Sequence, residues 1–258
     1  MLFQAGRKAL PDVNIPDTAM VFAAGFGTRM RPITNNIPKS LVKVAGKTLL
    51  DYSLDALVEA GIKKAVVNTH YLADLISQHL AGRKDIEIKI SHESPIILET
   101  GGGIVQALPL LGQKPFYVTN TDTFWIDKDK PALLRLAENW NPEKMDALLL
   151  LADIKGAIGY DGKGDFDLMP DGRLKRNKDG GACKFIYSGL MIIKPKIFHG
   201  CEPEPFSIFR DFLFKEEKYN NEDGSMPRIY GVVHNGTWLH VGTPDVIKLA
   251  EDVIGSLG

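Results

Sequence analysis

The fold of this chain is decided by residues 19–44, AMVFAAGFGTRMRPITNNIPKSLVKV. The stretch begins with an apolar run, residues 19–24, which predicts a buried strand. A glycine-rich turn follows at residues 25–28, and the basic residues Arg29 and Lys39 come after it. Glycine lets backbone N–H groups approach an anion closely, and nearby cations offset the charge of that anion. The stretch therefore predicts a strand whose carboxyl end wraps a di- or triphosphate.

The residues that follow alternate between short apolar runs and amphipathic patterns. The expected elements are strands at 65–68, 86–91 and 116–120, and helices from Thr48 (as N-cap), Leu72 and Ile104. Strands separated by helices favour right-handed crossovers, and hence an α/β fold with a mostly parallel sheet. Ligands of such sheets bind beyond the carboxyl ends of the strands, where we expect Gly25, Asn68 and Asp122 to gather.

The second half of the chain has a different pattern. It predicts helices at 132–140, at 206–217 and from Pro244 (with Thr243 as N-cap), and strands at 147–152, 185–193 and 229–233. A segment rich in glycine and aspartate, 156–181, carries hairpin signals at Asp161-Gly162 and Asp171-Gly172. Because no domain boundary is evident, we interpret residues 18–258 as one domain and residues 1–17 as a loosely ordered N-terminal extension.

The composition narrows the class of protein. The chain has 258 residues and a net charge of −1, which gives no global field for nucleic acid or an anionic membrane. It has no apolar run long enough to span a membrane and no convincing signal peptide. Cys183 and Cys201 lack the spacing of a metal site, so we expect reduced thiols in a cytoplasmic protein. The oligomeric state stays open.

The glycine turn fits neither of two common phosphate loops. The dinucleotide fingerprint and the P-loop both require glycine at position 30, which is Met30. The stretch instead resembles the signature of the sugar-1-phosphate nucleotidyltransferases, A-A-G-x-G-T-R-x-R-P-x-T followed by P-K-x-L-x-x-V-x-G-K. The matching segments are residues 23–34 and 38–47. The resemblance implies a Rossmann-like mixed sheet flanked by helices, without a C-terminal β-helix. It also implies a nucleotide half of about 18–125 and a sugar half of about 126–258.

The same resemblance implies roles for individual residues. Arg29 and Lys39 are expected to be catalytic, because cations stabilise the charge that builds up when a nucleotidyl group is transferred. Nucleotide binding is expected from Ala23, Ala24, Gly25, Gly27 and Thr28. Sugar-phosphate binding is expected from Asn68, Lys184, Ser188 and Gly189, and His70, beside Asn68, suits either a sugar contact or a structural role.

The resemblance further implies a Mg²⁺ site, with Mn²⁺ as an alternative. Asp122 follows a predicted strand, where the family has a metal-binding aspartate. The second metal ligand of the family is the aspartate of W-x-D-x-G-T, but this chain has His240 at that position. Imidazole is a poorer ligand than carboxylate for a hard cation. Three interpretations stay open: His240 binds the metal directly, His240 contacts a metal-bound water or phosphate, or the second contact is lost together with part or all of the activity.

A second glycine-rich run, Leu98-Glu99-Thr100-Gly101-Gly102-Gly103, is expected to be a loop that starts a helix. Backbone N–H groups at a helix start can face a nucleotide, so Glu99, Gly101 and Gly102 are further nucleotide-binding candidates. This run, with Ser91-His92-Glu93, most resembles the bacterial N-acetylmuramate α-1-phosphate uridylyltransferases.

The resemblance implies that the chain joins a nucleoside triphosphate to a sugar 1-phosphate and releases pyrophosphate. The expected substrates are UTP and N-acetylmuramic acid 1-phosphate, in the recycling of cell-wall sugars. A mannose-1-phosphate guanylyltransferase is the alternative specificity. A catalytically idle nucleotide or sugar-phosphate sensor is the alternative of another class, because His240 replaces the expected aspartate.

Overall fold

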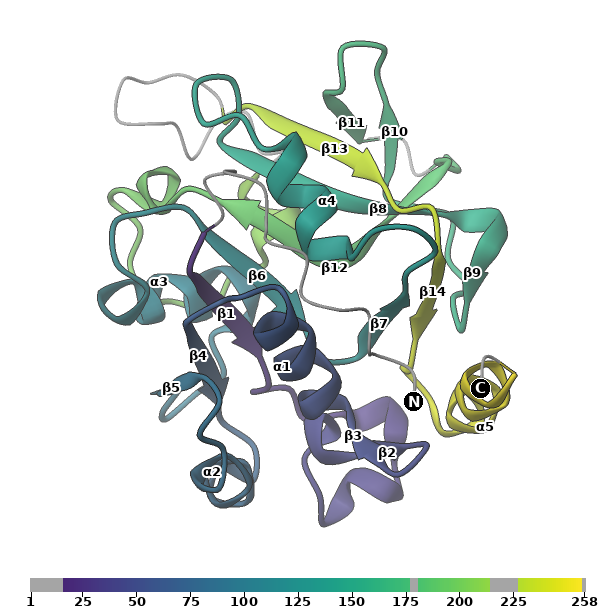
Figure 1. Ribbon diagram of the computed structural model, residues 1–258. Helices are drawn as coiled ribbons and strands as arrows, with labels where there is room; N and C mark the ends of the chain where they lie inside the picture. The colour runs from purple at the N-terminus through teal and green to yellow at the C-terminus, as the bar shows by residue number, and fades with distance from the viewer. Residues whose placement is uncertain (1–15, 177–180, 214–226, 257–258) are drawn as a thin grey trace.

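The computed structural model describes residues 16–176, 181–213 and 227–256 (Figure 1). Its main sheet has the order β11–β10–β12–β6–β1–β4–β5, and β8 and β13 pair beside β12. The bounds of these strands are β1 Thr18–Phe22, β4 Lys64–Thr69, β5 Glu87–His92, β6 Phe116–Asn120, β8 Ala147–Asp153, β10 Phe166–Leu168, β11 Leu174–Arg176, β12 Phe185–Ile193 and β13 Ile229–Val233. Strands β1, β4, β5 and β6 are parallel, whereas β12 is antiparallel to β6 and β8. The predicted mixed, mostly parallel sheet is thus confirmed.

Helices cover both faces of this sheet (Figure 1). One face packs against α1 (Leu49–Glu59), α2 (Ala73–Ala81) and α4 (Ala132–Asn139), through side chains such as Leu54 and Leu136. The other face packs against α3 (Glu99–Leu111) and the segment around Phe206 and Phe212. Successive side chains of β1 point to opposite faces of the sheet: Val21 packs on the face covered by α1, and Met20 packs on the face covered by α3. This explains why β1 is apolar throughout.

A second, three-stranded sheet continues from the carboxyl end of β6. It contains β7 (Thr123–Ile126), β14 (Thr237–His240) and β9 (Ala157–Ile158). The antiparallel register of β7 and β14 sets His240 opposite Thr123, and the N–H of Val241 donates to the carbonyl of Asp122. Residues far apart in the sequence therefore meet where the chain leaves the main sheet.

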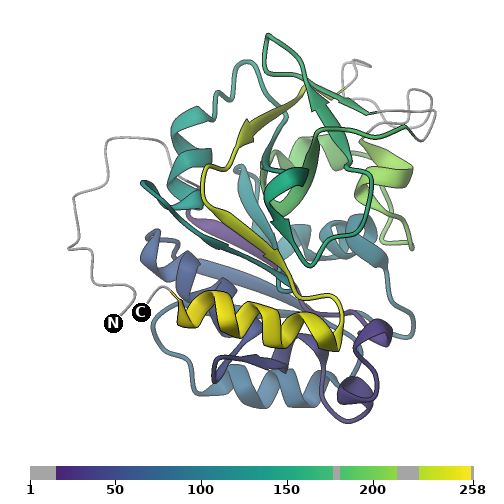
Figure 2. The same ribbon diagram turned by 90° about the vertical axis from the view of Figure 1, so that its right-hand side faces the viewer.

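The C-terminal helix α5 (Pro244–Gly255) covers this second sheet on one side. Val246 and Ala250 pack with Val44 of the short β2 strand (Lys43–Val44), which pairs with β3 (Lys47–Thr48). Figure 2 shows α5 in front of the segment that contains β2 and β3, against which it packs. Thr243 is the N-cap of α5 and proline occupies its first turn, as predicted, although the Thr243 side chain makes no capping hydrogen bond.

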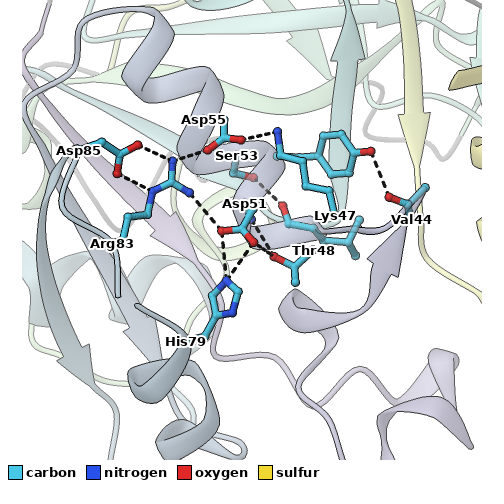
Figure 3. Close-up of polar contacts among 11 residues, drawn as sticks. Val44, Lys47, Thr48, Asp51, Ser53, Asp55, His79, Arg83 and Asp85 are labelled. Atoms are coloured by element: carbon cyan, nitrogen blue, oxygen red, sulfur yellow. Dashed lines mark hydrogen bonds and ion pairs between the residues drawn. The ribbon is translucent and has the colours of Figure 1, made fainter. Parts of the chain in front are cut away.

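Charged side chains tie α1 to α2 on the outside of the molecule (Figure 3). Thr48 caps α1 as predicted, by accepting a hydrogen bond from the N–H of Asp51. The Asp51 carboxylate also contacts His79 of α2 and Arg83, at 3.0 and 3.1 Å. Arg83 additionally pairs with Asp55 and Asp85. The network fixes how α2 lies against α1.

Three further predictions need correction. Residues 101–103 are not a loop but lie inside α3, which begins at Glu99. Asp161-Gly162 does not form a hairpin, because β9 pairs with β14 and not with β10. The predicted helix 206–217 is a short π-helix at Ile208–Phe212, and its remainder from 214 lies outside the described residues, as does most of the predicted extension 1–17. By contrast, Asp171-Gly172 does turn between β10 and β11.

The expectations on the two cysteines and on membrane spans can be compared with the structure. Cys183 and Cys201 are both free thiols. Among the described residues, each helix is too short or too polar to cross a membrane.

Asp127 makes the stability of this fold depend on pH. Burial raises the pKa of its carboxyl to about 6, although the N–H of Ala132 and the charge of Arg135 act in the opposite direction. The folded chain therefore holds this proton more tightly than the unfolded chain, and stability falls as the pH rises from about 4 to 6. We expect Asp127→Asn to increase the free energy of unfolding by about 1–2 kcal/mol at pH 7.5 and to change it little at pH 4.

Urea unfolding at the two pH values measures this effect. Asp74→Asn is the control, because Asp74 is an exposed carboxylate in the first turn of α2 and is not among the charges that act on Asp127. An Asp127→Asn variant no more stable than the wild type at pH 7.5 would contradict the assignment.

Candidate active site

A pocket of about 350 Å³ opens at the carboxyl ends of β1, β4 and β6. Its lining residues are Phe22, Ala23, Ala24, Gly25, Lys39, Ser40, Asn68, Glu93, Ile97, Glu99, Thr100, Asn120, Thr121, Asp122 and Ser207. Of the residues predicted for the site, the pocket thus contains Ala23, Ala24, Gly25, Lys39, Asn68, Glu99 and Asp122. This edge of the sheet is where parallel strands place ligands.

The glycine turn shapes one side of the pocket. Gly25 faces open space, because no atom lies within 4 Å of where its Cβ would be. Gly27 has a left-handed φ of 62°, and a Cβ there would lie 2.8 Å from Lys39 Cβ. The hydroxyl of Thr34 donates to the carbonyl of Gly27 at 2.7 Å. Glycine at 27 therefore lets Lys39 pack directly against the turn.

Lys39, Asp122 and His240 meet at one end of the pocket. Lys39 Nζ lies 2.6 Å from Asp122 Oδ2, and His240 Nε2 lies 3.6 Å from the same oxygen. Burial alone raises the pKa of Asp122, but the nearby Lys39 ammonium and His240 outweigh it and hold the pKa well below its usual range. Asp122 is therefore an ionised carboxylate at neutral pH.

The donor atoms of Asp122 and His240 fit a divalent cation. His240 Nδ1 lies 3.2 Å from the carbonyl of Gly159, which can only accept a hydrogen bond, so in the neutral ring Nδ1 carries the proton. Nε2 faces Asp122 at 3.6 Å, and a neutral ring whose Nδ1–H is held by a backbone carbonyl is the tautomer that can bind a metal through Nε2. The His240 ring is stacked on Trp238, with ring centroids 6.1 Å apart. No group of three or more metal-binding side chains occurs in the described ranges, so substrate oxygens would complete such a site.

Asn68 has a structural position that its sequence context did not indicate. Its Oδ1 accepts from the N–H of Ala23 at 2.7 Å, and its Nδ2 donates to Glu93 Oε1 at 2.6 Å. Glu93 in turn accepts from the N–H of Leu98 through Oε2. The Asn68 amide thus links the end of β1 to the wall beside Leu98, while Asn68 also lines the pocket, and its expected binding of sugar phosphate stays a prediction.

The second glycine run is buried by packing. A Cβ at Gly101 would lie 2.0 Å from the Phe206 ring, and one at Gly102 would lie 2.0 Å from the carbonyl oxygen of Glu204. The N–H of Gly101 donates to the carbonyl of Phe206 at 2.8 Å. The expectation that Gly101 and Gly102 present free N–H groups to a nucleotide is therefore wrong for Gly101, and neither glycine lines the pocket.

The other predicted residues lie around the pocket. Thr28 and Arg29 are exposed beyond the glycine turn, and the described residues offer the Arg29 side chain no ion pair. Lys184 is exposed and its Nζ lies over the Phe185 ring. Ser188 is buried, and its carbonyl accepts from the Trp238 indole. Gly189 has a φ of 85° and lies against Thr123, so glycine is required where β12 meets the end of β6.

Several pocket residues were not predicted. Glu93 lies at the carboxyl end of β5, and a carboxylate directly after a predicted strand was a signal that could have found it. Its pKa is raised by burial despite the hydrogen bonds from Leu98 and Asn68. Ser40 is buried, and its hydroxyl finds no partner within the described part of the chain. Ser207 comes from the second half, and no local pattern points to it.

Comparison with known proteins agrees with this geometry. Residues 18–160 match the model of the nucleotidyl transferase family. The chain belongs to this family. It is 44% identical over 240 residues to N-acetylmuramate alpha-1-phosphate uridylyltransferase of Caulobacter vibrioides, covering 92% of this chain and 96% of the relative. It is 26% identical to the mannose-1-phosphate guanylyltransferase catalytic subunit beta of Danio rerio, covering 88% of this chain and 61% of that subunit.

The fold recurs in a solved structure of low sequence similarity. The inositol-1-phosphate CTP transferase from T. maritima superposes with a TM-score of 0.74 at 18% identity, covering 95% of this chain and 97% of that one. The chain is accordingly an enzyme of nucleotidyl transfer, in a family that generally uses a divalent metal.

Proposed function

We propose that the chain transfers the uridylyl group of UTP to N-acetylmuramic acid α-1-phosphate and releases pyrophosphate. The observation that carries the proposal is the Lys39–Asp122 pair beside the glycine turn, in a pocket at the carboxyl ends of the parallel strands. The choice of substrates is supported by the printed name of the Caulobacter relative, which is far more similar to this chain than the guanylyltransferase subunit is.

In the proposed reaction, a phosphate oxygen of the sugar 1-phosphate attacks the α-phosphorus of UTP. A new P–O bond forms, the bond from the α-phosphorus to the bridging oxygen breaks, and pyrophosphate leaves with the electron pair. Lys39 stabilises the negative charge of the reacting phosphates, and exposed Arg29 binds the triphosphate from the open side of the turn. Gly25 lets the phosphates approach the backbone.

Asp122 and His240 would hold the divalent cation. When bound, the cation neutralises phosphate charge and aligns the two reactants. His240 directs a nitrogen toward this position, so we expect Mn²⁺ to bind more tightly than Mg²⁺.

Pyrophosphate release tests the substrates. Four nucleoside triphosphates (UTP, GTP, CTP and dTTP) are combined with N-acetylmuramic acid, mannose and glucose 1-phosphates. UTP with N-acetylmuramic acid 1-phosphate is expected to give the highest kcat/KM. Preference for GTP with mannose 1-phosphate would support the alternative specificity, and a chain without turnover for any pair would be the idle sensor.

Replacing the histidine tests the metal assignment. We expect His240→Asp to reduce the preference for Mn²⁺ over Mg²⁺ by about tenfold, because a carboxylate suits the harder ion better than imidazole does. Titration of Mn²⁺ followed by electron paramagnetic resonance, with Mg²⁺ as competitor and nucleotide present, measures this ratio without turnover. His92→Asp, at the exposed end of β5, is the control. An unchanged ratio in His240→Asp would show that His240 does not bind the metal.

A further inference from the structure

One wall of the pocket is held by a segment from the second half of the chain. Glu99 and Thr100 line the pocket within the run Leu98–Gly101 (the pocket wall), and the segment is Phe206–Arg210 (the clamp segment). The N–H of Phe206 donates to the carbonyl of Leu98 at 3.3 Å, and the carbonyl of Phe206 accepts from the N–H of Gly101 at 2.8 Å. These two backbone bonds fasten Phe206 across the first turn of α3.

Two side-chain contacts extend this attachment. The N–H of Ile208 donates to Thr100 Oγ1 at 2.9 Å. Arg210 Nη2 lies 2.9 Å from Glu99 Oε2. Every residue from Leu98 to Gly101 is therefore bonded to the clamp segment. Glu99 and Thr100 line the pocket, and so does Ser207 of the clamp segment.

The backbone of the pocket wall is strained at Glu99. Its φ is 57°, in the left-handed region that is unfavourable for a residue with a Cβ. Such a conformation persists only where the surroundings fix it, and it is found preferentially at ligand-binding sites. Here the clamp segment supplies contacts to Glu99 and to the residues on both sides of it.

The absence of a side chain at Gly101 leaves room for the Phe206 ring of the clamp segment. Phe206 is buried with 5% of its surface exposed, and its ring occupies the space that a Cβ at Gly101 would need. Gly→Ala within a helix ordinarily stabilises it. At Gly101 the methyl group would instead collide with a rigid ring at 2.0 Å.

We propose that Phe206 is a positioning residue for the nucleotide. Through the bonds of the clamp segment it keeps Glu99 in its left-handed conformation and Thr100 beside it, where both contact the nucleoside part of the triphosphate. The inference rests on the proposed function, in that the pocket is taken to bind a nucleoside triphosphate. It assigns the glycine run to the seating of Phe206 and not to direct binding of phosphate.

A double-mutant cycle tests the proposal. UTP binding is measured by calorimetry, without acceptor, for the wild type, Gly101→Ala, Phe206→Ala and the double variant. We expect each single variant to weaken UTP binding by about tenfold, as small displacements of positioning groups do. The double variant should bind as Phe206→Ala does, because the new methyl group no longer meets a ring. Gly255→Ala, a helical glycine with open space around it, is the control.

Further measurements separate positioning from plain stability. Phe206→Leu keeps most of the apolar volume and is expected to weaken UTP binding by about threefold. It replaces Phe206→Ala in the measurement if that variant does not fold. Phe198→Leu, in the same apolar cluster, should lower Tm to a similar extent without weakening UTP binding. The KM for the sugar 1-phosphate should change less than twofold in all folded variants, because the pocket wall is proposed to contact the nucleotide and not the sugar.

The proposal is overturned if Gly101→Ala and Phe206→Leu lower Tm but bind UTP like the wild type. It is also overturned if the two losses add in the double variant. Failure of the proposed function can be told apart from failure of this proposal. In that case the wild type would bind UTP but release no pyrophosphate with N-acetylmuramic acid 1-phosphate. If the wild type binds another nucleoside triphosphate more tightly, the cycle is run with that nucleotide.

Discussion

Replacing Lys39 by methionine is expected to lower kcat/KM by about 10²–10³, the loss seen when one preorganised donor to a developing charge is removed. Methionine keeps much of the apolar length of lysine but cannot pair with Asp122 or with a phosphate. The Lys39 ammonium is also the strongest influence that lowers the pKa of Asp122. In the variant, burial raises the pKa of this carboxyl, and activity should fall on acidification at a higher pH than in the wild type.

Pyrophosphate release across a pH series measures both effects. Lys43→Met is the matched control, because Lys43 is an exposed residue of the neighbouring β2 strand. A Lys39→Met variant that retains more than about a tenth of wild-type kcat/KM would exclude Lys39 from the stabilisation of the transferred group.

Asp122→Asn is expected to produce two opposite effects. The kcat should fall by about 10³, because the amide is a weaker metal ligand than the carboxylate. In the presence of a chelator, however, the variant should bind UTP about tenfold more tightly than the wild type, since a negative charge beside the phosphates is removed and Lys39 is released. In the wild type Lys39 Nζ and Asp122 Oδ2 are only 2.6 Å apart, so the pair must separate before Lys39 can bind a phosphate.

Calorimetric titration of UTP with and without metal distinguishes these effects from a general loss of structure. Asp74→Asn, at an exposed position in the first turn of α2, is the control. If Asp122→Asn binds UTP no better than the wild type in the chelator, Lys39 is not restrained by Asp122 in the way that the geometry implies.

Much of the site could be predicted because its residues belong to short, continuous patterns. The strand from Thr18 to Phe22, the turn at Gly25 and the Pro38-Lys39 pair lie within one stretch, and each has a local physical reason. Asp122 could be predicted for the same reason, since it lies two residues after the end of an apolar strand. The register of β7 and β14 that brings His240 to Asp122 could not be read from the sequence.

The two glycine runs show the limit of what local sequence can predict. Glycine allows close approach of any group, and a sequence does not say whether that group is a phosphate or a side chain. Around Gly25 the space is open, as predicted for a ligand. Around Gly101 the space is filled by Phe206, so the same composition serves packing in a different part of the pocket. The bonds of the Asn68 amide to Ala23 and Glu93 could likewise not be read from the sequence, because they join three separate segments of the chain.

The sequence by itself determined the alternation of strands and helices, the parallel core of the sheet and the basic glycine turn at its edge. These features depend on apolar periodicity and on the backbone freedom of glycine, which act over a few neighbouring residues. Only the tertiary structure decided that Lys39 and His240 both lie close to Oδ2 of Asp122, and that a segment around Phe206 contacts Glu99 in the pocket wall. Contacts of this kind join distant parts of the chain, and they exist only once the packed core has fixed the relative positions of the strands.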